Sequence, residues 1–192
     1  MDTIRLVSWN VNGFRALSGK PDWDWFASTD ADVVALQETK DEPAQIAEEH
    51  RSPEGWNAEW LAAQVKKGYS GVAVFSRQKA ALEPLAVHRE LPDPRYQGEG
   101  RLLHIEYPAF HFFNVYFPNG TKDDGRLAYK MGYYDAFLAH AEELRAIGLG
   151  VPEAQKIDEA LLARFELAKE VVTAVRNIRK QKNIPQKDPL TL

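Results

Sequence analysis

The stretch Asp32-Val33-Val34-Ala35-Leu36-Gln37-Glu38-Thr39-Lys40 predicts a buried strand whose end carries a carboxylate. Its four contiguous apolar residues, bounded by polar ones, are typical of a strand that is covered on both faces in a layered α/β fold. Such folds usually place their chemistry at the carboxyl ends of their strands. Glu38 is therefore the first candidate for a functional residue.

A second apolar segment, Leu6-Val7-Ser8-Trp9-Asn10-Val11-Asn12-Gly13, ends in amides. If the two predicted strands are neighbours, they present Asn10, Asn12 and Glu38 to one site. An all-oxygen cluster of this kind suits Mg²⁺. For either motif alone a plainer interpretation stays open, in which the amides cap turns and the carboxylate is a solvated strand end.

The composition of the 192-residue chain predicts an ordinary soluble protein, with one domain or one domain and an appendage. The absence of cysteine excludes disulfides, thiol catalysis and thiolate metal sites, and it agrees with a cytoplasmic location. No signal pattern and no long apolar run is present, so we expect no membrane contact. The net charge of −4 argues against strong, indiscriminate nucleic-acid binding, but not against a metal-bridged phosphodiester.

The apolar periodicities predict a mixed α/β arrangement. Paired strands are expected at residues 56–62 with 70–76, and at residues 102–107 with 110–117. Helices are expected at residues 22–26, 40–51 and 124–147. Residues 83–100 contain three prolines and two glycines and are predicted to be irregular.

The five histidines show no metal-ligand spacing, and each is expected to be structural. They are His50, His88, His104, His111 and His140. No Ser/His/Asp order, phosphate-binding loop or dinucleotide fingerprint can be built either.

The chain changes character near residues 148–152, where we place a domain boundary. Residues 153–192 contain one aromatic residue and carry 8 basic and 6 acidic residues, net +2, whereas residues 1–152 carry 16 and 22, net −6. Helical spacing runs from 153 to 184 without Gly or Pro. We therefore expect a globular unit at residues 1–148 and a helical appendage at residues 149–192.

A set of motifs in the first unit closely resembles exonuclease III-type apurinic/apyrimidinic endonucleases, which belong to the endonuclease/exonuclease/phosphatase family. The matching motifs are Ser8-Trp9-Asn10-Val11-Asn12-Gly13-Phe14-Arg15-Ala16, Leu36-Gln37-Glu38-Thr39-Lys40, Gly68-Tyr69-Ser70-Gly71, Gly100-Arg101 and Asn114-Val115-Tyr116-Phe117-Pro118-Asn119-Gly120. The resemblance covers about residues 3–148. It implies the N-terminal part of a four-layer α/β sandwich and hydrolysis of phosphodiesters in duplex DNA beside abasic sites, with Mg²⁺ or possible Mn²⁺ as cofactor.

The resemblance also implies roles for individual residues. Glu38 would be the metal ligand, with Asn10 nearby and Asn12 at a metal-facing catalytic position where many members have Asp. Tyr116 would hydrogen-bond to the scissile phosphate, and Asn119 and Arg15 would contact DNA. A hard cation with oxygen ligands would neutralise the phosphate and position the attacking water.

The departures from the family pattern predict negligible activity. No Asp precedes an Asn by two positions and no Asp directly precedes a His, so the Gly-Asp-x-Asn and Asp-His parts of the site are absent from this sequence. We also expect the second sheet of the sandwich to be missing. An apolar sheet face would then be exposed, in part covered by the 153–184 helix, and could cause self-association.

The last 40 residues resemble a helical, tRNA-binding segment of valyl-tRNA synthetase. Four cations could then bind RNA: Arg176, Arg179, Lys180 and Lys182. The alternative function is a non-catalytic fusion or remnant that binds tRNA through this basic helix. Because cations near a helix C-terminus also favour the helix macrodipole, charge placement alone does not separate RNA binding from helix stabilisation.

Overall fold

The computed structural model describes residues 3–121 and 123–146, which belong to the first of two compact units, Met1–Gly150. The predicted 153–184 helix and its four RNA-binding candidates lie outside the described residues, as does the proposed domain boundary. None of the described helices is long and apolar enough to span a lipid bilayer.

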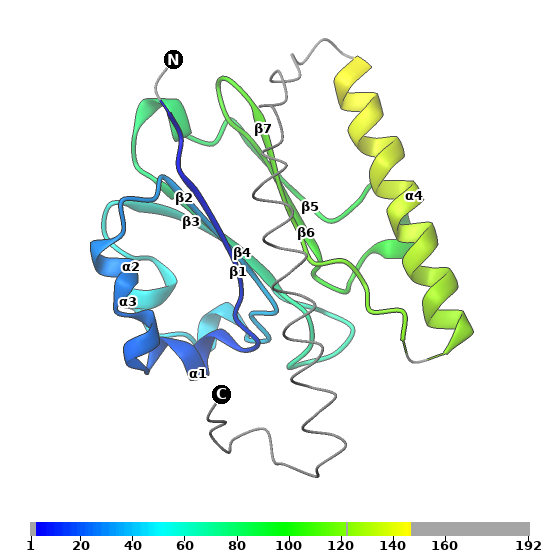
Figure 1. The fold of residues 1–192 in the computed structure, drawn as a ribbon, viewed down its shortest axis with the longest axis horizontal. Coiled ribbons are helices and arrows are strands. Elements are labelled where there is room, and N and C mark those ends of the chain that lie inside the picture. The colour runs from blue at the N-terminus through cyan, green and yellow to red at the C-terminus, as the bar shows by residue number, and fades with distance from the viewer. Residues whose placement is uncertain (1–2, 122, 147–192) are drawn as a thin grey trace, which may run out of the picture. The chain divides into compact units, whose positions relative to one another are not determined.

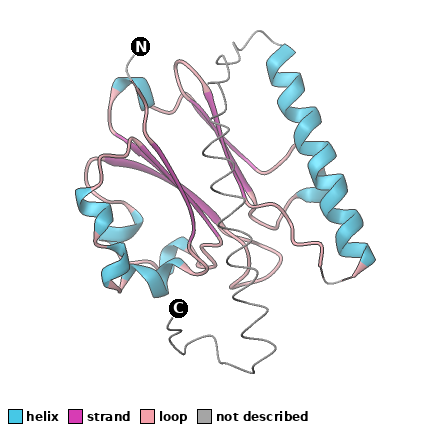
Figure 2. Cartoon of the chain, viewed as in Figure 1, coloured by secondary structure: helices cyan, strands magenta, loops and turns pink. Residues whose placement is uncertain are grey.

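The first unit is an α/β sandwich in which helices flank two sheets (Figures 1 and 2). The first sheet has the order β1-β2-β4-β3, from β1 (Leu6–Asn10), β2 (Val33–Gln37), β3 (Trp56–Leu61) and β4 (Val72–Arg77). The second has the order β5-β6-β7, from β5 (Ala86–Arg89), β6 (Leu102–Glu106) and β7 (His111–Val115). The helices are α1 (Phe14–Ser18), α2 (Trp25–Ser28), α3 (Glu48–Arg51) and α4 (Asp124–Ala146), with 3-10 turns η1 (Pro21–Trp23), η2 (Pro43–Gln45), η3 (Ala80–Leu82) and η4 (Pro94–Tyr96).

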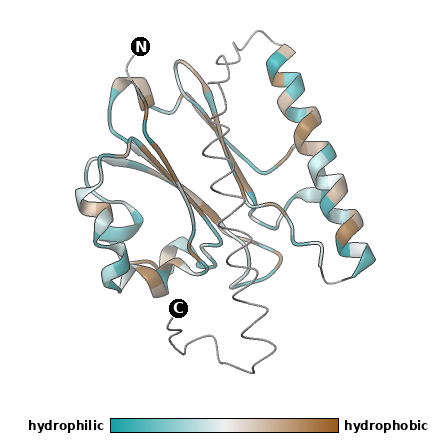
Figure 3. Ribbon diagram, viewed as in Figure 1, coloured by the Kyte–Doolittle hydropathy of each residue, from teal (hydrophilic) through white to brown (hydrophobic). Residues whose placement is uncertain are grey.

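Strand β2 occupies the interior of the first sheet, as its apolar run predicts. It pairs parallel with β1 and antiparallel with β4. Val34 and Leu36 pack into the core beneath α1 and α2, whereas Val33 packs into the core between the two sheets. Both faces of β2 are therefore dry, which explains why the strand has no polar residue before Gln37. Figure 3 shows the hydrophobic colouring concentrated along these strands.

The expectation of a missing second sheet is wrong. Leu103 and Ile105 of β6 pack against Val33 and Val74 of the first sheet, and together they form a core between the sheets. The alternate residues of β6 face the other way, toward α4, where Leu102 packs with residues of that helix. Because a strand presents successive side chains to opposite faces, β6 contributes to both layers. An exposed sheet face is thus no longer a reason to expect self-association.

Two further predictions fail locally. Residues 83–100, predicted to be irregular, contain β5, which pairs antiparallel with β6 in the register Val87↔Ile105. Residues 40–51, predicted as a helix, form only η2 and the short α3. Pro43 explains the interruption, because proline lacks an N–H and disfavours helical backbone at the residue before it. The two strand pairs and the long helix are confirmed, the last as α4.

Candidate active site

The loops that follow β1 and β2 are joined by backbone hydrogen bonds and turn sharply. Val11 N donates to Gln37 O at 2.9 Å, and Gly13 N donates to Glu38 O at 2.7 Å. Asn12 and Glu38 both have left-handed backbone, with φ of 49° and 55°. Non-glycine residues in this region are strained and cluster at functional sites. The paired turns place both side chains at one edge of the first sheet.

The three residues predicted to meet do meet. Asn10 Nδ2 donates to Glu38 Oε1 at 2.9 Å, and the Asn12 backbone N–H donates to Asn10 Oδ1 at 3.2 Å. The Lys40 ammonium lies 3.1 Å from Glu38 Oε2 and also donates to Asn12 Oδ1. A positive charge is therefore held by the same oxygens that were predicted to bind a metal ion.

Tyr116 lies beside Glu38 and completes this cluster. Burial favours the protonated form of Glu38, but hydrogen bonds from Asn10 and Tyr116 and the charge of Lys40 outweigh it, so the pKa of Glu38 is lowered. Burial, followed by the hydrogen bond to Glu38 and its charge, raises the pKa of Tyr116 to about 12. At neutral pH the site therefore presents an ionised carboxylate, an ammonium group and a protonated phenol. A protonated phenol can donate a hydrogen bond to a phosphate oxygen.

Asn114, which was not predicted to have a role, joins the two sheets below this cluster. Its Nδ2 donates to Leu36 O and Ala73 O, each at 2.9 Å, and its Oδ1 accepts from Gln37 Nε2 at 2.7 Å. The side chain is 2% exposed, so every polar atom needs a partner inside the protein. Asn114 and Tyr116 lie two residues apart, and the Asn114 bridge thereby fixes the position of Tyr116 relative to Glu38. An amide within the apolar run Phe112-Phe113-Asn114-Val115 is the feature that could have revealed it.

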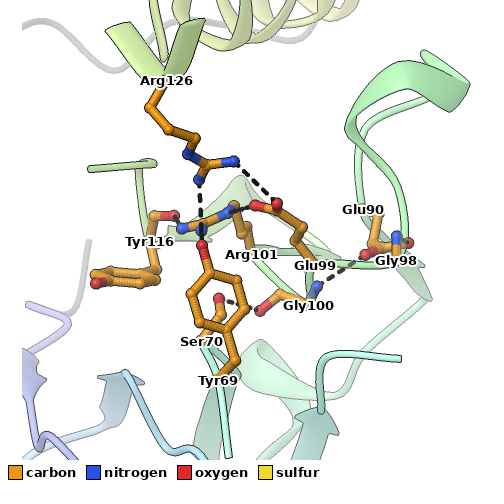
Figure 4. Close-up of polar contacts among 9 residues, drawn as sticks. All are labelled: Tyr69, Ser70, Glu90, Gly98, Glu99, Gly100, Arg101, Tyr116 and Arg126. Carbon is orange, nitrogen blue, oxygen red and sulfur yellow. Dashed lines mark hydrogen bonds and ion pairs between the residues drawn. The ribbon is translucent and has the colours of Figure 1, made fainter. Parts of the chain in front are cut away.

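A buried arginine supports Tyr116 from the other side (Figure 4). Arg101 is 1% exposed, and it donates to Tyr116 O at 3.0 Å and to Tyr69 Oη at 2.6 Å. It pairs with Glu99, which also accepts from Arg126 at 3.2 Å. Burial opposes ionisation of Glu99, but hydrogen bonds and charge from Arg101 and Arg126 outweigh it and lower the pKa of Glu99. The three charged side chains Arg101, Arg126 and Glu99 together carry a charge of +1.

The loop that carries Arg101 requires glycine at position 100. Gly100 has φ of +64°, and a Cβ at this position would lie 2.6 Å from Ala63 N. Its N–H donates to Glu90 Oε1 at 2.9 Å, and its carbonyl accepts from Gly71 N at 3.1 Å. The motif Gly100-Arg101 therefore combines a close backbone crossing with the buried cation.

The other predicted DNA contacts, Asn119 and Arg15, have local partners. Asn119 is exposed, and its Oδ1 accepts from Thr121 N at 2.9 Å within a turn. Arg15 pairs with Asp41 at 3.7 Å, and its side chain is 61% exposed. Within residues 3–121 and 123–146, no hydrogen bond or ion pair links either residue to Glu38. Both remain available to a ligand that approaches from solvent.

Residues 7–152 match the model of the endonuclease/exonuclease/phosphatase family. The chain belongs to this family. Over 142 residues it is 39% identical to the exodeoxyribonuclease of Bacillus subtilis, and the alignment covers 73% of this chain and 53% of that relative. Over 138 residues it is 35% identical to the DNA repair nuclease APEX1 of Danio rerio, covering 71% and 43%. The chain thus spans about half the length of the family relatives it matches, or less.

Solved structures of the family share the fold. The catalytic domain of Xenopus laevis APE2 matches with a TM-score of 0.63 and 27% identity, over 74% of this chain and 55% of that one. The 3′ phosphatase NExo from Neisseria, solved with a product DNA hairpin, matches with a TM-score of 0.62 and 25% identity, over 75% and 53%. The family match ends near the start of the segment that resembles valyl-tRNA synthetase. That second resemblance therefore remains a prediction.

Proposed function

We propose that the first unit provides the metal-binding and phosphate-binding part of a DNA-repair nuclease site of the exonuclease III type. The observation that carries this proposal is the pairing of an ionised Glu38 with a protonated Tyr116, at a sheet edge rigidified by Asn114 and Arg101. The relatives named as nucleases support DNA as the substrate class. Abasic duplex DNA is the substrate we propose.

The oxygen donors fit a hard divalent cation such as Mg²⁺, with Mn²⁺ as a substitute. Glu38 offers a carboxylate, and Asn10 and Asn12 offer amide oxygens, which is the chemistry that Mg²⁺ prefers when it keeps several of its waters. When bound, such an ion would neutralise charge on the phosphate. Lys40 contacts Glu38 and Asn12 directly, so an ion that binds these oxygens must displace the ammonium group. We therefore propose that metal binding is weak without DNA.

The protein's own groups would act on the phosphodiester as follows. The Tyr116 hydroxyl, which donates its single proton to Glu38 in the free protein, would turn it to a non-bridging phosphate oxygen of bound DNA, and its raised pKa keeps that proton in place at neutral pH. Arg101 holds the Tyr116 carbonyl and lies 5.1 Å from the centre of its ring. The phenol is thus held in one position before the substrate arrives, which lowers the entropy lost on binding. Lys40, once displaced from Glu38, adds a positive charge beside the phosphate.

We further propose that this chain hydrolyses DNA very slowly. In the part of the chain that the structure describes, the only group of three His, Asp or Glu side chains close enough to share a metal does not include Glu38. The sequence has no Gly-Asp-x-Asn and no Asp-His motif. Loss of one member of a catalytic group can lower the rate by several orders of magnitude, and such losses are not additive.

The test uses the full chain with a fluorescent duplex that contains an abasic site, in Mg²⁺ and in EDTA. We expect binding that is stronger in Mg²⁺ and sensitive to salt, weakened by Tyr116→Phe, and independent of Mg²⁺ in Glu38→Ala. An exposed pair on α4, Glu142 and Glu143, supplies a control variant, Glu142→Ala, that should bind as the wild type does. Equal binding by all variants would overturn the assignment of the site. Metal-dependent incision that Glu38→Ala abolishes would confirm the site and overturn the proposed loss of activity.

A further inference from the structure

Four of the five histidines gather on the outer face of the second sheet, away from the candidate active site. Strand register places His88 opposite His104 and Glu106 opposite His111. The ring centre of His104 lies 4.8 Å from that of His88, 4.9 Å from that of His111 and 5.8 Å from that of His140, which projects from α4. The sequence separates these residues, so no local spacing motif revealed them.

We propose that His104, Glu106 and His111 bind a divalent transition-metal ion of the Zn²⁺ type. Coordinating atoms of these three side chains all lie within 4.8 Å of one another. Two imidazoles and a carboxylate are a ligand set suited to Zn²⁺, whereas Mg²⁺ and Ca²⁺ prefer all-oxygen sites. Three protein ligands would leave one position of a tetrahedral ion open to water.

An unpartnered buried nitrogen is the second observation at this site. His104 is 1% exposed, and its Nδ1 has no hydrogen-bond partner. The buried Nδ1 of His140, on the adjacent helix, also lacks one. Buried polar atoms almost always have partners, so two unpaired imidazole nitrogens mark unmet hydrogen-bonding capacity at this cluster. An ion between His104 and His111 would take Nε2 of His104, the nitrogen that faces His111.

A neighbouring residue and a cavity complete the site. His88 Nε2 lies 2.6 Å from Glu106 Oε1 and would orient the carboxylate, as a supporting histidine or carboxylate often does at a metal centre. A cavity of about 410 Å³ opens beside these side chains. Its lining includes His88, His104, Glu106 and His140, so an ion and its waters can reach the cluster from solvent.

The plainer alternative is that His104 and His111 form only a hydrogen bond with each other. Their nitrogens lie 2.6 Å apart. Two imidazole nitrogens on a tetrahedral zinc ion are separated by about 3.3 Å, given a Zn–N distance of about 2.0–2.1 Å. Metal binding therefore requires the rings to separate by about 0.7 Å. His111 is partly exposed at the first residue of β7, where it is free to make this shift.

The proposed metal site is distinct from the candidate active site. Arg101 and Tyr116 flank one end of the β6–β7 pair, and Glu106 and His111 lie at the other end. Glu106 lies five residues after Arg101 along the strand, a rise of about 17 Å. A variant at either site can thus be expected to leave the other intact.

The experiment titrates the metal-free full chain, without an affinity tag, with Co²⁺ as a spectroscopic probe and then with Zn²⁺ as competitor. We expect one equivalent of Co²⁺ to give intense visible absorption from a four-coordinate site, and Zn²⁺ to remove it. Glu106→Gln and His111→Asn should weaken binding at least about tenfold, since even supporting residues contribute that much. His50→Asn, on α3 outside the cluster, should bind as the wild type does.

Thermal denaturation of the metal-free variants separates lost binding from lost folding. Glu106 is partly exposed and its replacement by Gln keeps the side-chain shape, so this variant decides the test if His111→Asn does not fold. Absence of four-coordinate Co²⁺ absorption in the wild type would overturn the proposal. Unchanged affinity in Glu106→Gln, or loss of the site in His50→Asn, would overturn it equally.

Discussion

Replacement of Asn114 by alanine tests whether the two sheets are joined through this one amide. The substitution removes three hydrogen bonds, to Leu36 O, Ala73 O and Gln37 Nε2. Each bond contributes about 1 kcal/mol net, and buried groups left without partners add to the loss. Gln37 keeps Ser8 Oγ at 3.1 Å as a partner, which limits the penalty on that side. We therefore expect the free energy of unfolding to fall by about 2–4 kcal/mol.

A loss of this size is measurable against the usual total of about 5–15 kcal/mol. For a domain of this length it corresponds to a fall in melting temperature of about 6–12 °C. The assay is urea denaturation followed by tryptophan fluorescence, with thermal denaturation as a second measurement. Asn119→Ala is the matched control, because the same substitution in an exposed turn should change the stability by less than about 1 kcal/mol.

A double-mutant cycle locates the effect at the bridge itself. Gln37→Ala and Asn114→Ala share one hydrogen bond at 2.7 Å, so their effects should be non-additive by about 0.5–1.5 kcal/mol. If Asn114→Ala costs no more than the Asn119→Ala control, the amide does not join the sheets. Additive effects of the two substitutions would show that the contact with Gln37 contributes nothing.

Three further predictions concern charge, backbone and the C-terminal segment. The pKa of Glu38 is lowered in the folded chain, so the ionised carboxylate contributes to stability above the unfolded pKa near 4.5. This contribution is lost as the pH falls through the lower folded pKa. Glu38→Gln should therefore reduce the loss of stability measured by acid titration below about pH 4.5. Gly100→Ala should lower the free energy of unfolding, measured in urea, by more than about 2 kcal/mol. Gly55→Ala is the control, because Gly55 also has positive φ but a Cβ there would meet no heavy atom within 4 Å, and it should lower stability by about 1 kcal/mol. Equal effects would contradict the close crossing at Gly100. If residues 153–192 bind RNA, filter binding should detect a salt-sensitive complex with tRNA, and truncation after residue 152 should abolish it. Binding retained by the truncated chain would contradict the RNA-binding role predicted for Arg176, Arg179, Lys180 and Lys182.

The sequence predicted the centre of the candidate site because the positions of Asn10 and Glu38 depend on residues that are close to them in the sequence. Four apolar residues in a row favour a strand with two dry faces, and the polar residue that follows then emerges at its end, as Glu38 does. The amides after β1 follow the same logic, since a parallel neighbour places Asn10 beside that end. Tyr116 was found only through the family resemblance, because an aromatic residue before a turn has many ordinary uses.

The parts that were missed depend on which strand lies next to which. The alternation Leu102-Leu103-His104-Ile105-Glu106 shows that β6 has two different faces, but it does not say that Leu103 and Ile105 meet the first sheet. The wrong expectation that the second sheet is missing follows from this ambiguity. His88 and His104 are opposite each other only because β5 and β6 pair in one register, which a search for spaced ligands does not detect. Asn114 was overlooked because its partners are backbone carbonyls of distant strands.

The position of the second sheet has a consequence for biosynthesis. All seven strands of the described residues lie before residue 116, so the layers on both sides of β2 are encoded in the first three fifths of the sequence. Chains fold from the N-terminal end as they leave the ribosome. The nascent polypeptide can thus bury Val33, Val74 and Ile105 before α4 has emerged from the ribosome. The outer face of the second sheet, which carries His88, His104 and His111, is covered only once that helix packs, so the order of synthesis leaves these imidazoles open to solvent and dissolved ions until last.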